Sequence, residues 1–261
     1  MNGIDARALV LVAMGGPAAC VAHERVATQR ASTTASATAS LAPSVPKTTP
    51  TAPTASAVDV AEINRPFREL KDVQSWVARF ERESREIYAK RVEIADALGL
   101  KPGTRVADVG AGTGLFEPYF SLLVGPAGRV FAVDIAPLFV EHLRRRALAE
   151  ALPNVEAARC PDTATGLPAR SVDVVFVCDV YHHFEHPELN LASIRETLTD
   201  GGRFVIVDFE KEPGQASDFV MKHVRAPKAA VRAEIEAAGF ELEREEKILK
   251  ENYLLVFRKK G

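Results

Sequence analysis

The sequence lacks the features that mark membrane-spanning, disulfide-rich and nucleic-acid-binding proteins. No stretch approaches the roughly 20 consecutive apolar residues that a helix needs to span a bilayer. Only three cysteines occur in 261 residues, and the formal net charge of -2 gives no bulk attraction to nucleic acid or anionic lipid. What the chain does have is an ordinary globular composition, 47% hydrophobic and 26% charged, with enough residues for a large core.

The N-terminal residues differ in kind from the rest. Residues 27–58 are nearly all Ala, Ser, Thr and Pro, so we expect a disordered linker over residues 27–63. Ahead of it, a short apolar run at residues 8–14 is followed by small residues and Cys20, as in an export signal that ends in a lipid-attachment cysteine. We therefore interpret residues 1–26 as a signal or lipoprotein segment that would tether the protein to a membrane through Cys20. An unstructured cytoplasmic extension is the alternative.

One folded domain is predicted over residues 64–261. It begins with apolar residues at helical spacing, such as Trp76 and Phe80, which predict helices before Gly99. Five predicted strands then alternate with helical stretches, a pattern typical of a parallel, doubly wound sheet. The strands are at residues 105–109, 130–134, 155–160, 172–180 and 203–209, with helices such as 137–151 and 188–198 between most of them.

The C-terminal pattern departs from the all-parallel sheet that is usual for dehydrogenases. After a predicted helix at 228–238, residues 241–248 and 253–259 form two predicted strands, and the link of four residues permits only an antiparallel hairpin. We therefore predict an α/β fold of the Rossmann-like, doubly wound type. It has a seven-stranded sheet, mostly parallel with a C-terminal antiparallel hairpin, and helices on both faces.

The strongest functional signal is a glycine-rich segment after the first predicted strand. Gly110, Gly112 and Gly114 follow that strand directly, and Asp134 ends the next strand twenty residues later. Glycines permit a tight turn and close approach of the backbone to a ligand, and an acidic side chain at this distance accepts hydrogen bonds from a ribose. A dinucleotide fingerprint has its third glycine one residue later, where this chain has Leu115. A pyrophosphate is therefore not the expected ligand.

Several segments resemble class I S-adenosylmethionine-dependent methyltransferases. Residues 108–114 have the acidic-x-Gly-x-Gly-x-Gly form of motif I, and residues 129–135, 179–183 and 201–208 resemble a bacterial branch of the methyltransferase-domain proteins. This resemblance implies S-adenosylmethionine as the cofactor. It indicates the reaction more firmly than the acceptor, because many members of that branch lack an assigned substrate.

Ligands of open α/β sheets bind beyond the carboxyl ends of the strands, so the predicted site is made of strand-end residues. Under the resemblance, Asp108 and the glycines would hold the methionine part, Asp134 the ribose and Ile135 the adenine. Residues after the third strand would meet the adenine amino group, and those after the fourth would lie beside the sulfonium methyl. The predicted cofactor-binding residues are Asp108, Gly110, Ala111, Gly112, Thr113, Gly114, Asp134, Ile135, Asp162, Thr163, Asp179 and Val180.

Methyl transfer from a sulfonium needs no acid, but a hydroxyl, phenol or thiol acceptor needs a base, and histidine suits that role. His182, His183 and His223 are the predicted catalytic residues, with a hydrogen-bonded pocket wall as the alternative for each. Asp208 or Glu210, at the end of the fifth predicted strand, could orient an acceptor.

A metal site in the same region is disfavoured. His182, His183 and His186 lie close in sequence to Asp179, but Pro187 disfavours a helix at His186, so a shared helical face is not expected. We therefore predict no metal. The same strand end lacks the Pro-Pro-aromatic signature of amino-methylating nucleic-acid enzymes, so we also predict no nucleic-acid partner.

The helices before residue 105 are predicted to fold over the cofactor as a lid. Trp76, Phe80, Tyr88 and Arg91 are potential acceptor contacts there, with plain packing on the sheet as the alternative for each.

Together these features predict an S-adenosylmethionine-dependent methyltransferase that acts on a small-molecule O, S or N nucleophile by in-line displacement. Three alternatives stay open: a module that binds the cofactor without turnover, an NAD-dependent Rossmann oxidoreductase, and a methyltransferase that acts on protein or lipid.

Overall fold

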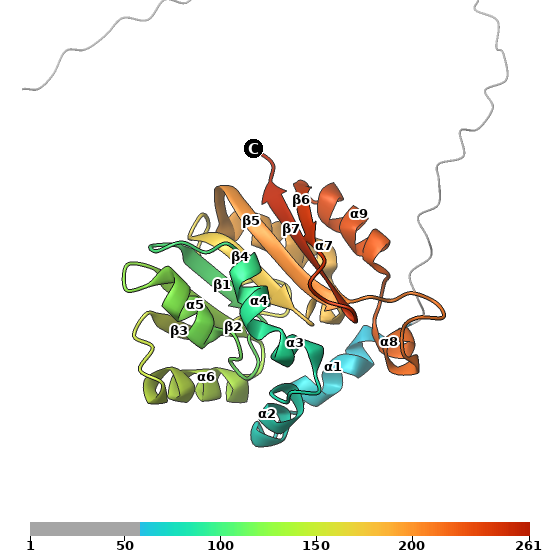
Figure 1. Cartoon of the computed structure of the whole chain (residues 1–261), viewed down its shortest axis with the longest axis horizontal. Coiled ribbons are helices and arrows are strands. Elements are labelled where there is room, and N and C mark those ends of the chain that lie inside the picture. The colour runs from blue at the N-terminus through green and yellow to red at the C-terminus, as the bar shows by residue number, and fades with distance from the viewer. Residues whose placement is uncertain (1–57) are drawn as a thin grey trace, which may run out of the picture. The chain divides into compact units, whose positions relative to one another are not determined.

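The computed structural model describes residues 58–261, which Figure 1 colours from blue to red. The predicted signal or lipoprotein segment, Cys20 and most of the predicted linker lie outside the described residues. Within residues 58–261, no helix combines the length and the apolar character that crossing a bilayer requires.

The folded region begins earlier than the sequence predicted. Helix α1 (Val60–Arg68) starts inside the predicted linker, which was expected to extend to residue 63. The carboxylate of Asp59 accepts hydrogen bonds from the backbone N–H groups of Ala61 and Glu62, at 3.1 and 3.3 Å. This N-cap satisfies two donors that the first turn of a helix cannot pair internally. The predicted start of the folded domain at residue 64 is therefore corrected to Asp59.

Seven strands form one sheet in the order β3-β2-β1-β4-β5-β7-β6. The first five pair in parallel, and β7 runs antiparallel between β5 and β6. The strands are β1 (Arg105–Val109), β2 (Arg129–Asp134), β3 (Val155–Arg159), β4 (Val172–Cys178), β5 (Leu198–Phe209), β6 (Phe240–Glu246) and β7 (Asn252–Lys259). The predicted fold class is confirmed.

The strand bounds follow the predicted ones closely except at the start of β5. That strand begins at Leu198, which pairs with Val172, whereas the prediction began it at residue 203. Gly201 and Gly202 lie within the strand, which pairs with β4 through a register shift between Val172 and Val174.

Helices cover both faces of the sheet, as predicted. One face carries α4 (Arg91–Ala97), α5 (Glu117–Val124) and α6 (Pro137–Ala149), and the other carries α7 (Pro187–Thr197) and α9 (Lys228–Ala237). Each face buries its own apolar cluster, and the central strand β4 contributes side chains to both. A strand buried on both faces explains why its sequence is apolar almost throughout.

Three short helices lie beyond the ends of the parallel strands instead of on a face. They are α1, α2 (Gln74–Phe80) and α8 (Asp218–His223), which Figure 1 shows along the bottom, from the centre to the right. The remaining helical turns are α3 (Glu86–Ala89) and a single 3-10 turn, η1 (Tyr181–His183). α1 contacts η1, so the N-terminal helices reach the end of β4.

One buried carboxyl group is a local source of instability. Glu117 begins α5 and is only 2% exposed. Burial raises its pKa from 4.5 to about 7. Because the folded state holds the proton more tightly than the unfolded chain does, the free energy of unfolding decreases as the pH rises between these two values.

We expect the Glu117→Gln variant to remove this pH dependence. Its free energy of unfolding, relative to wild type, should be about 2 kcal/mol larger at pH 8 than at pH 5. Urea titrations at the two pH values measure this difference. Glu141→Gln is the matched control, because the Glu141 side chain on α6 is 61% exposed. Equal differences for the two variants at both pH values would contradict the prediction.

Candidate functional site

A cavity of about 770 Å³ lies at the carboxyl ends of β1, β2 and β4. Its walls come from the loops after these strands and from α1, α2 and α8. Strand β1 has β2 on one side and β4 on the other, so the strand order reverses there. The cavity therefore lies at the switch point of the sheet. Open α/β sheets bind their ligands at this position.

Gly110 and Gly112 shape the loop between β1 and the cavity. Both have positive φ, +78° and +56°, in the region that favours glycine. A Cβ on Gly110 would lie 2.6 Å from the Val180 side chain, whereas one on Gly112 would approach only the Gly110 carbonyl oxygen, at 3.9 Å. Gly110 therefore allows the ends of β1 and β4 to meet, and Gly112 leaves the cavity open. Ala111 and Thr113 also line it.

Gly114 does not line the cavity, although the sequence predicted a cofactor contact there. A Cβ at this position would lie 2.9 Å from the Leu143 side chain and 3.3 Å from that of Arg146, both on α6. We therefore assign Gly114 to the close packing of α6 against the loop. The third glycine of the motif is needed for the fold and does not contact the ligand space.

Asp134 ties the glycine loop to α6. Its carboxylate accepts hydrogen bonds from the backbone N–H groups of Gly112, at 2.9 Å, and Ala136, at 2.8 Å. Burial raises its pKa to about 6. Asp108 lies nearby, and burial together with the neighbouring Glu117 carboxyl raises its pKa well above the ordinary range. Both aspartates line the cavity, where the rest of their hydrogen-bonding capacity is available to a ligand.

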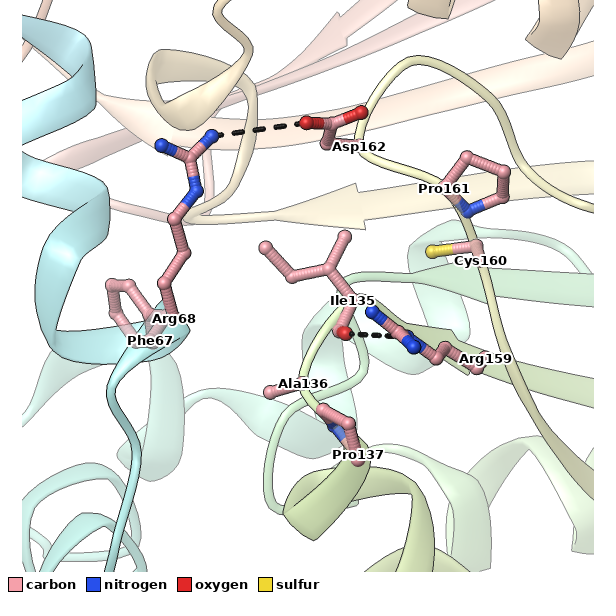
Figure 2. Close-up of a pocket in the computed structure, with 9 residues that line it drawn as sticks. All are labelled: Phe67, Arg68, Ile135, Ala136, Pro137, Arg159, Cys160, Pro161 and Asp162. Atoms are coloured by element: carbon pink, nitrogen blue, oxygen red, sulfur yellow. Dashed lines mark hydrogen bonds and ion pairs between the residues drawn. The ribbon is translucent and has the colours of Figure 1, made fainter.

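A second hollow of about 620 Å³ adjoins the first, and Phe67, Ile135 and Asp162 line both (Figure 2). Figure 2 shows the Ile135 side chain pointing into the space between α1 and the loop after β3. Asp162 lies at its rim, 61% exposed and 3.7 Å from the Arg68 guanidinium. Thr163 does not line either hollow, whereas the next residue, Ala164, lines the larger one. The predicted adenine-side pair is therefore corrected to Asp162 without Thr163.

Asp179 lies at the end of β4 in a left-handed backbone conformation, with φ +52°, which is unusual for a residue other than glycine. Its carboxylate forms an ion pair with Arg85 and accepts a hydrogen bond from Asn252 Nδ2 at 2.7 Å. Burial raises the pKa of Asp179, and the Arg85 charge counters that rise. Arg85 comes from the segment between α2 and α3, so the pair attaches the N-terminal helices to the sheet. Val180 lines the cavity next to it.

The three predicted histidines meet in the same cavity. The ring centroids of His182 and His183 are 4.2 Å apart, and that of His223 is 5.2 and 5.3 Å from them. Nδ1 of His182 lies 2.7 Å from Asp208 Oδ1, and Nδ1 of His183 lies 2.7 Å from Asn64 Oδ1. These partners leave the Nε2 atoms of both rings for the cavity.

The histidines differ in their proton affinity. Burial lowers the pKa of His182, but the Asp208 carboxylate outweighs burial and the net pKa is above the ordinary value. Burial lowers the pKa of His183 well below that value, and it lowers the pKa of His223 to about 4. His183 and His223 are therefore neutral imidazoles at neutral pH.

The structure separates the two carboxylates at the end of β5. Asp208 is 1% exposed, and it holds His182 at both the ring and the backbone N–H. Glu210 does not line the cavity and pairs with Lys228 at 2.8 Å. Asp208 therefore orients a histidine, and Glu210 contributes to a surface ion pair. The prediction that either one orients an acceptor directly is corrected.

The N-terminal helices cover the cavity with only part of the predicted set. Trp76 and Phe80 line it, on α2. Tyr88 and Arg91 do not, because the Arg91 guanidinium lies 4.1 Å above the Tyr88 ring and its Nε donates to the Tyr119 hydroxyl at 2.8 Å. Arg91 on α4 thus connects Tyr88 on α3 with Tyr119 on α5, and both predicted residues are corrected to structural roles.

The family comparison agrees with this geometry. Residues 107–206 match the family model described as a methyltransferase domain. Residues 107–206 therefore form a methyltransferase domain, and the fold is that of S-adenosylmethionine-dependent methyltransferases. The matched segment runs from within β1 to within β5, so it includes the glycine loop, Asp134 and the end of β4. The predicted family and its cofactor, S-adenosylmethionine, are confirmed.

Curated relatives of the methyltransferase domain cover part of the chain. The ubiquinone/menaquinone biosynthesis C-methyltransferase UbiE of Ectopseudomonas mendocina is 32% identical over 126 residues, 48% of each protein. An uncharacterized protein of Streptomyces fradiae is 35% identical over 113 residues, 43% of this chain and 32% of that protein. The chain thus spans about half the length, or less, of these relatives.

Solved structures share the fold at lower identity. A SAM dependent methyltransferase from Aquifex aeolicus has a TM-score of 0.59 at 23% identity, over 77% of this chain and 98% of that one. A putative methyltransferase in complex with the Haloferax volcanii Trm112 activator has a TM-score of 0.62 at 17% identity, over 72% and 96%. The [4+2]-cyclase SpnF has a TM-score of 0.57 at 15% identity, over 67% and 83%.

The methyltransferase domain also uses residues that sequence reasoning missed. Asn64, Arg85 and Phe219 line the cavity beside the predicted residues. Asn64 is the first residue of the predicted domain and had no predicted role, and Asp59, as the N-cap of α1, places it on a helix. Arg85 and Phe219 lie outside any periodic pattern, so their positions depend on tertiary structure alone.

We expect Asp134→Ala to weaken S-adenosylmethionine binding by about 10- to 100-fold, because a charged hydrogen-bond acceptor is removed from the proposed ribose contact. Calorimetry with S-adenosylmethionine and S-adenosylhomocysteine measures the change. Asp173→Ala is the control, since Asp173 binds Arg105 at the opposite end of the sheet and should leave the affinity unchanged. Thermal melting shows whether each variant is folded. Wild-type affinity in folded Asp134→Ala would refute the assignment.

Proposed function

We propose that this chain transfers the methyl group of S-adenosylmethionine to an O, S or N atom of a small molecule by in-line displacement. The observation that carries the proposal is that His182, held by the buried Asp208, lines the same cavity as the glycine loop. One end of the cavity has the backbone and carboxylates suited to the cofactor. The other end has imidazole nitrogens suited to an acceptor.

The cofactor end supports the following arrangement. The loop at Gly110 and Gly112, with Asp108, would hold the amino acid part of the cofactor. Asp134 would accept hydrogen bonds from the ribose hydroxyls. Ile135 would pack on the adenine, and Asp162 would meet its amino group at the rim of the second hollow. This order follows the strand ends from β1 through β2 to β3.

Methyl transfer needs little covalent chemistry from the protein. The acceptor atom bonds to the methyl carbon, the carbon–sulfur bond breaks, and its electron pair stays on the sulfur of a neutral thioether. Holding the two reactants in line in a dry site can supply about 7 to 11 kcal/mol of the barrier reduction. An O–H or S–H acceptor must also lose a proton, and His182 is placed to receive it because Asp208 fixes its ring through Nδ1.

Enclosure favours a small acceptor over a macromolecule. Residues of α1, α2 and α8 line the same cavity as the strand ends, so these helices close it from outside the sheet. Aromatic side chains form its apolar wall on this side, among them Trp76, Phe80 and Phe219. A flat or phenolic acceptor fits such a wall.

One observation favours the alternative that the chain binds the cofactor without transferring its methyl group. The fold is shared with a [4+2]-cyclase as well as with methyltransferases. The fold therefore does not decide the reaction. Turnover of the methyl group decides it. An assay with methyl-labelled S-adenosylmethionine against pooled phenols, thiols, amines and cell extract tests turnover and acceptor class together. Because the UbiE relatives are named C-methyltransferases, NMR of the product should distinguish methyl groups on oxygen from those on carbon.

With an active acceptor in hand, Asp208→Asn should reduce kcat by about 100-fold or more and leave the dissociation constant of S-adenosylmethionine unchanged. The reason is that the amide no longer fixes the His182 ring, while the cofactor end of the cavity is untouched. Glu210→Gln is the matched control and should keep the wild-type kcat. Equal kcat values for the two folded variants would contradict the role of Asp208.

A further inference from the structure

We propose that His182, His183 and His223 form a binding site for one divalent transition-metal ion, with Zn²⁺ as the representative ion. Each histidine offers one ring nitrogen, and the three nitrogens lie within 4.8 Å of one another. Nitrogens in a tetrahedral zinc site with bonds of about 2.0 to 2.1 Å are roughly 3.3 Å apart. Small rotations of the rings would therefore close the site around an ion.

His182 and His183 have the hydrogen bonds that are usual for histidines that bind a metal ion. A metal-binding histidine usually donates its other ring nitrogen to a carboxylate or carbonyl oxygen, which fixes the ring and makes the free nitrogen a better ligand. The Asp208 carboxylate lies 2.7 Å from Nδ1 of His182, and the Asn64 side-chain oxygen lies 2.7 Å from Nδ1 of His183, so each can accept such a hydrogen bond. In both rings this leaves Nε2 for the ion.

His223 completes the set from a different part of the chain. It ends α8, and its ring stacks on Phe219 with centroids 4.6 Å apart. None of the hydrogen bonds found within residues 58–261 uses a His223 ring nitrogen. The ring is thus held against the other two histidines by aromatic packing, and its nitrogens are available.

The chemistry of the donors favours a first-row transition metal. Three imidazoles suit Zn²⁺ and its neighbours in the series, whereas Mg²⁺ and Ca²⁺ prefer oxygen ligands. Three protein ligands also leave one position of a tetrahedral ion open, which is the arrangement of catalytic zinc sites. Asp208, 1% exposed, supplies negative charge beside the site.

The sequence does not indicate this site, because His186 is the third histidine close to His182 and His183 in the chain, whereas His223 is the third one in space. His186 is 55% exposed and lies 3.8 Å from a carboxylate oxygen of Glu188. It is the residue before α7 and is not part of the cluster. His223 takes its place, 37 residues further along the chain by sequence number.

A metal at this site would take part in the proposed methyl transfer. This catalytic role rests on the proposed function, whereas metal binding itself does not. A hydroxyl or thiol acceptor that coordinates the open position would release its proton to solvent. Its oxygen or sulfur would then bond to the methyl carbon as the carbon–sulfur bond breaks toward the neutral thioether. His182 would hold the ion instead of receiving the proton. The acceptor class is then a hydroxyl, phenol or thiol that can ligate a metal.

Metal binding is tested without cofactor or acceptor, so its failure is distinct from failure of methyl transfer. The full chain, purified without a histidine tag and freed of metal with a chelator, is titrated with Zn²⁺ against a chromophoric competitor and with Co²⁺ by visible absorption. We expect one ion per chain with a dissociation constant in the micromolar range or below. We also expect Co²⁺ absorption bands typical of four-coordinate nitrogen sites.

His223→Ala should weaken Zn²⁺ binding by at least 100-fold, and Asn64→Ala by about 10-fold through loss of the His183 orientation. His186→Ala is the matched control and should bind as wild type does. Thermal melting confirms that each variant is folded, and His223 is the preferred ligand to remove because it has no buried charged partner. Absence of stoichiometric binding by wild type, or equal affinity of His223→Ala and His186→Ala, would overturn the proposal.

Discussion

The parallel pairing of β1 with β2 on one side and β4 on the other is the constraint on which the rest of the site depends. It aligns Ala107 with Phe131 and with Val175, so the three strands end at the same edge of the sheet. Asp108, Asp134 and Asp179 each lie at or directly after one of these ends. The paired apolar residues of each strand align the strand ends, so the loops that follow these ends lie close together.

The polar groups at this edge form a network that the apolar sheet surrounds. Asp108, Asp134 and Asp208 are each at most 6% exposed, yet each lies next to a backbone donor, a histidine or another carboxyl group. Such groups are costly to bury without a ligand or partner. Their concentration at one edge, opposite the ordinary ion pair of Arg105 with Asp173, distinguishes the functional end of the sheet from the structural end.

The N-terminal helices connect this network to the cavity wall. Asn64 on α1 binds the His183 ring and the Glu185 side chain, and Arg85 binds Asp179. The helices are therefore attached through polar contacts to residues that follow β4, and their aromatic side chains face the same space. A ligand that changes the charge near Asp179 or His183 would therefore also change the interactions that hold these helices, because the contacts are electrostatic and partly buried.

The sequence by itself determined the strands, their alternation with helices, the glycine loop and the acidic residue after β2. These follow from local rules: apolar runs, glycine where φ is positive, and a fixed distance from loop to carboxylate. It did not determine which residues share a space. Gly114 packs against α6, Thr163 does not line the cavity, and Arg91 binds Tyr88 and Tyr119, because packing between segments that are distant in sequence decides what each residue contacts. For the same reason His223, and not His186, lies beside His182 and His183, since only the folded chain places α8 near the end of β4.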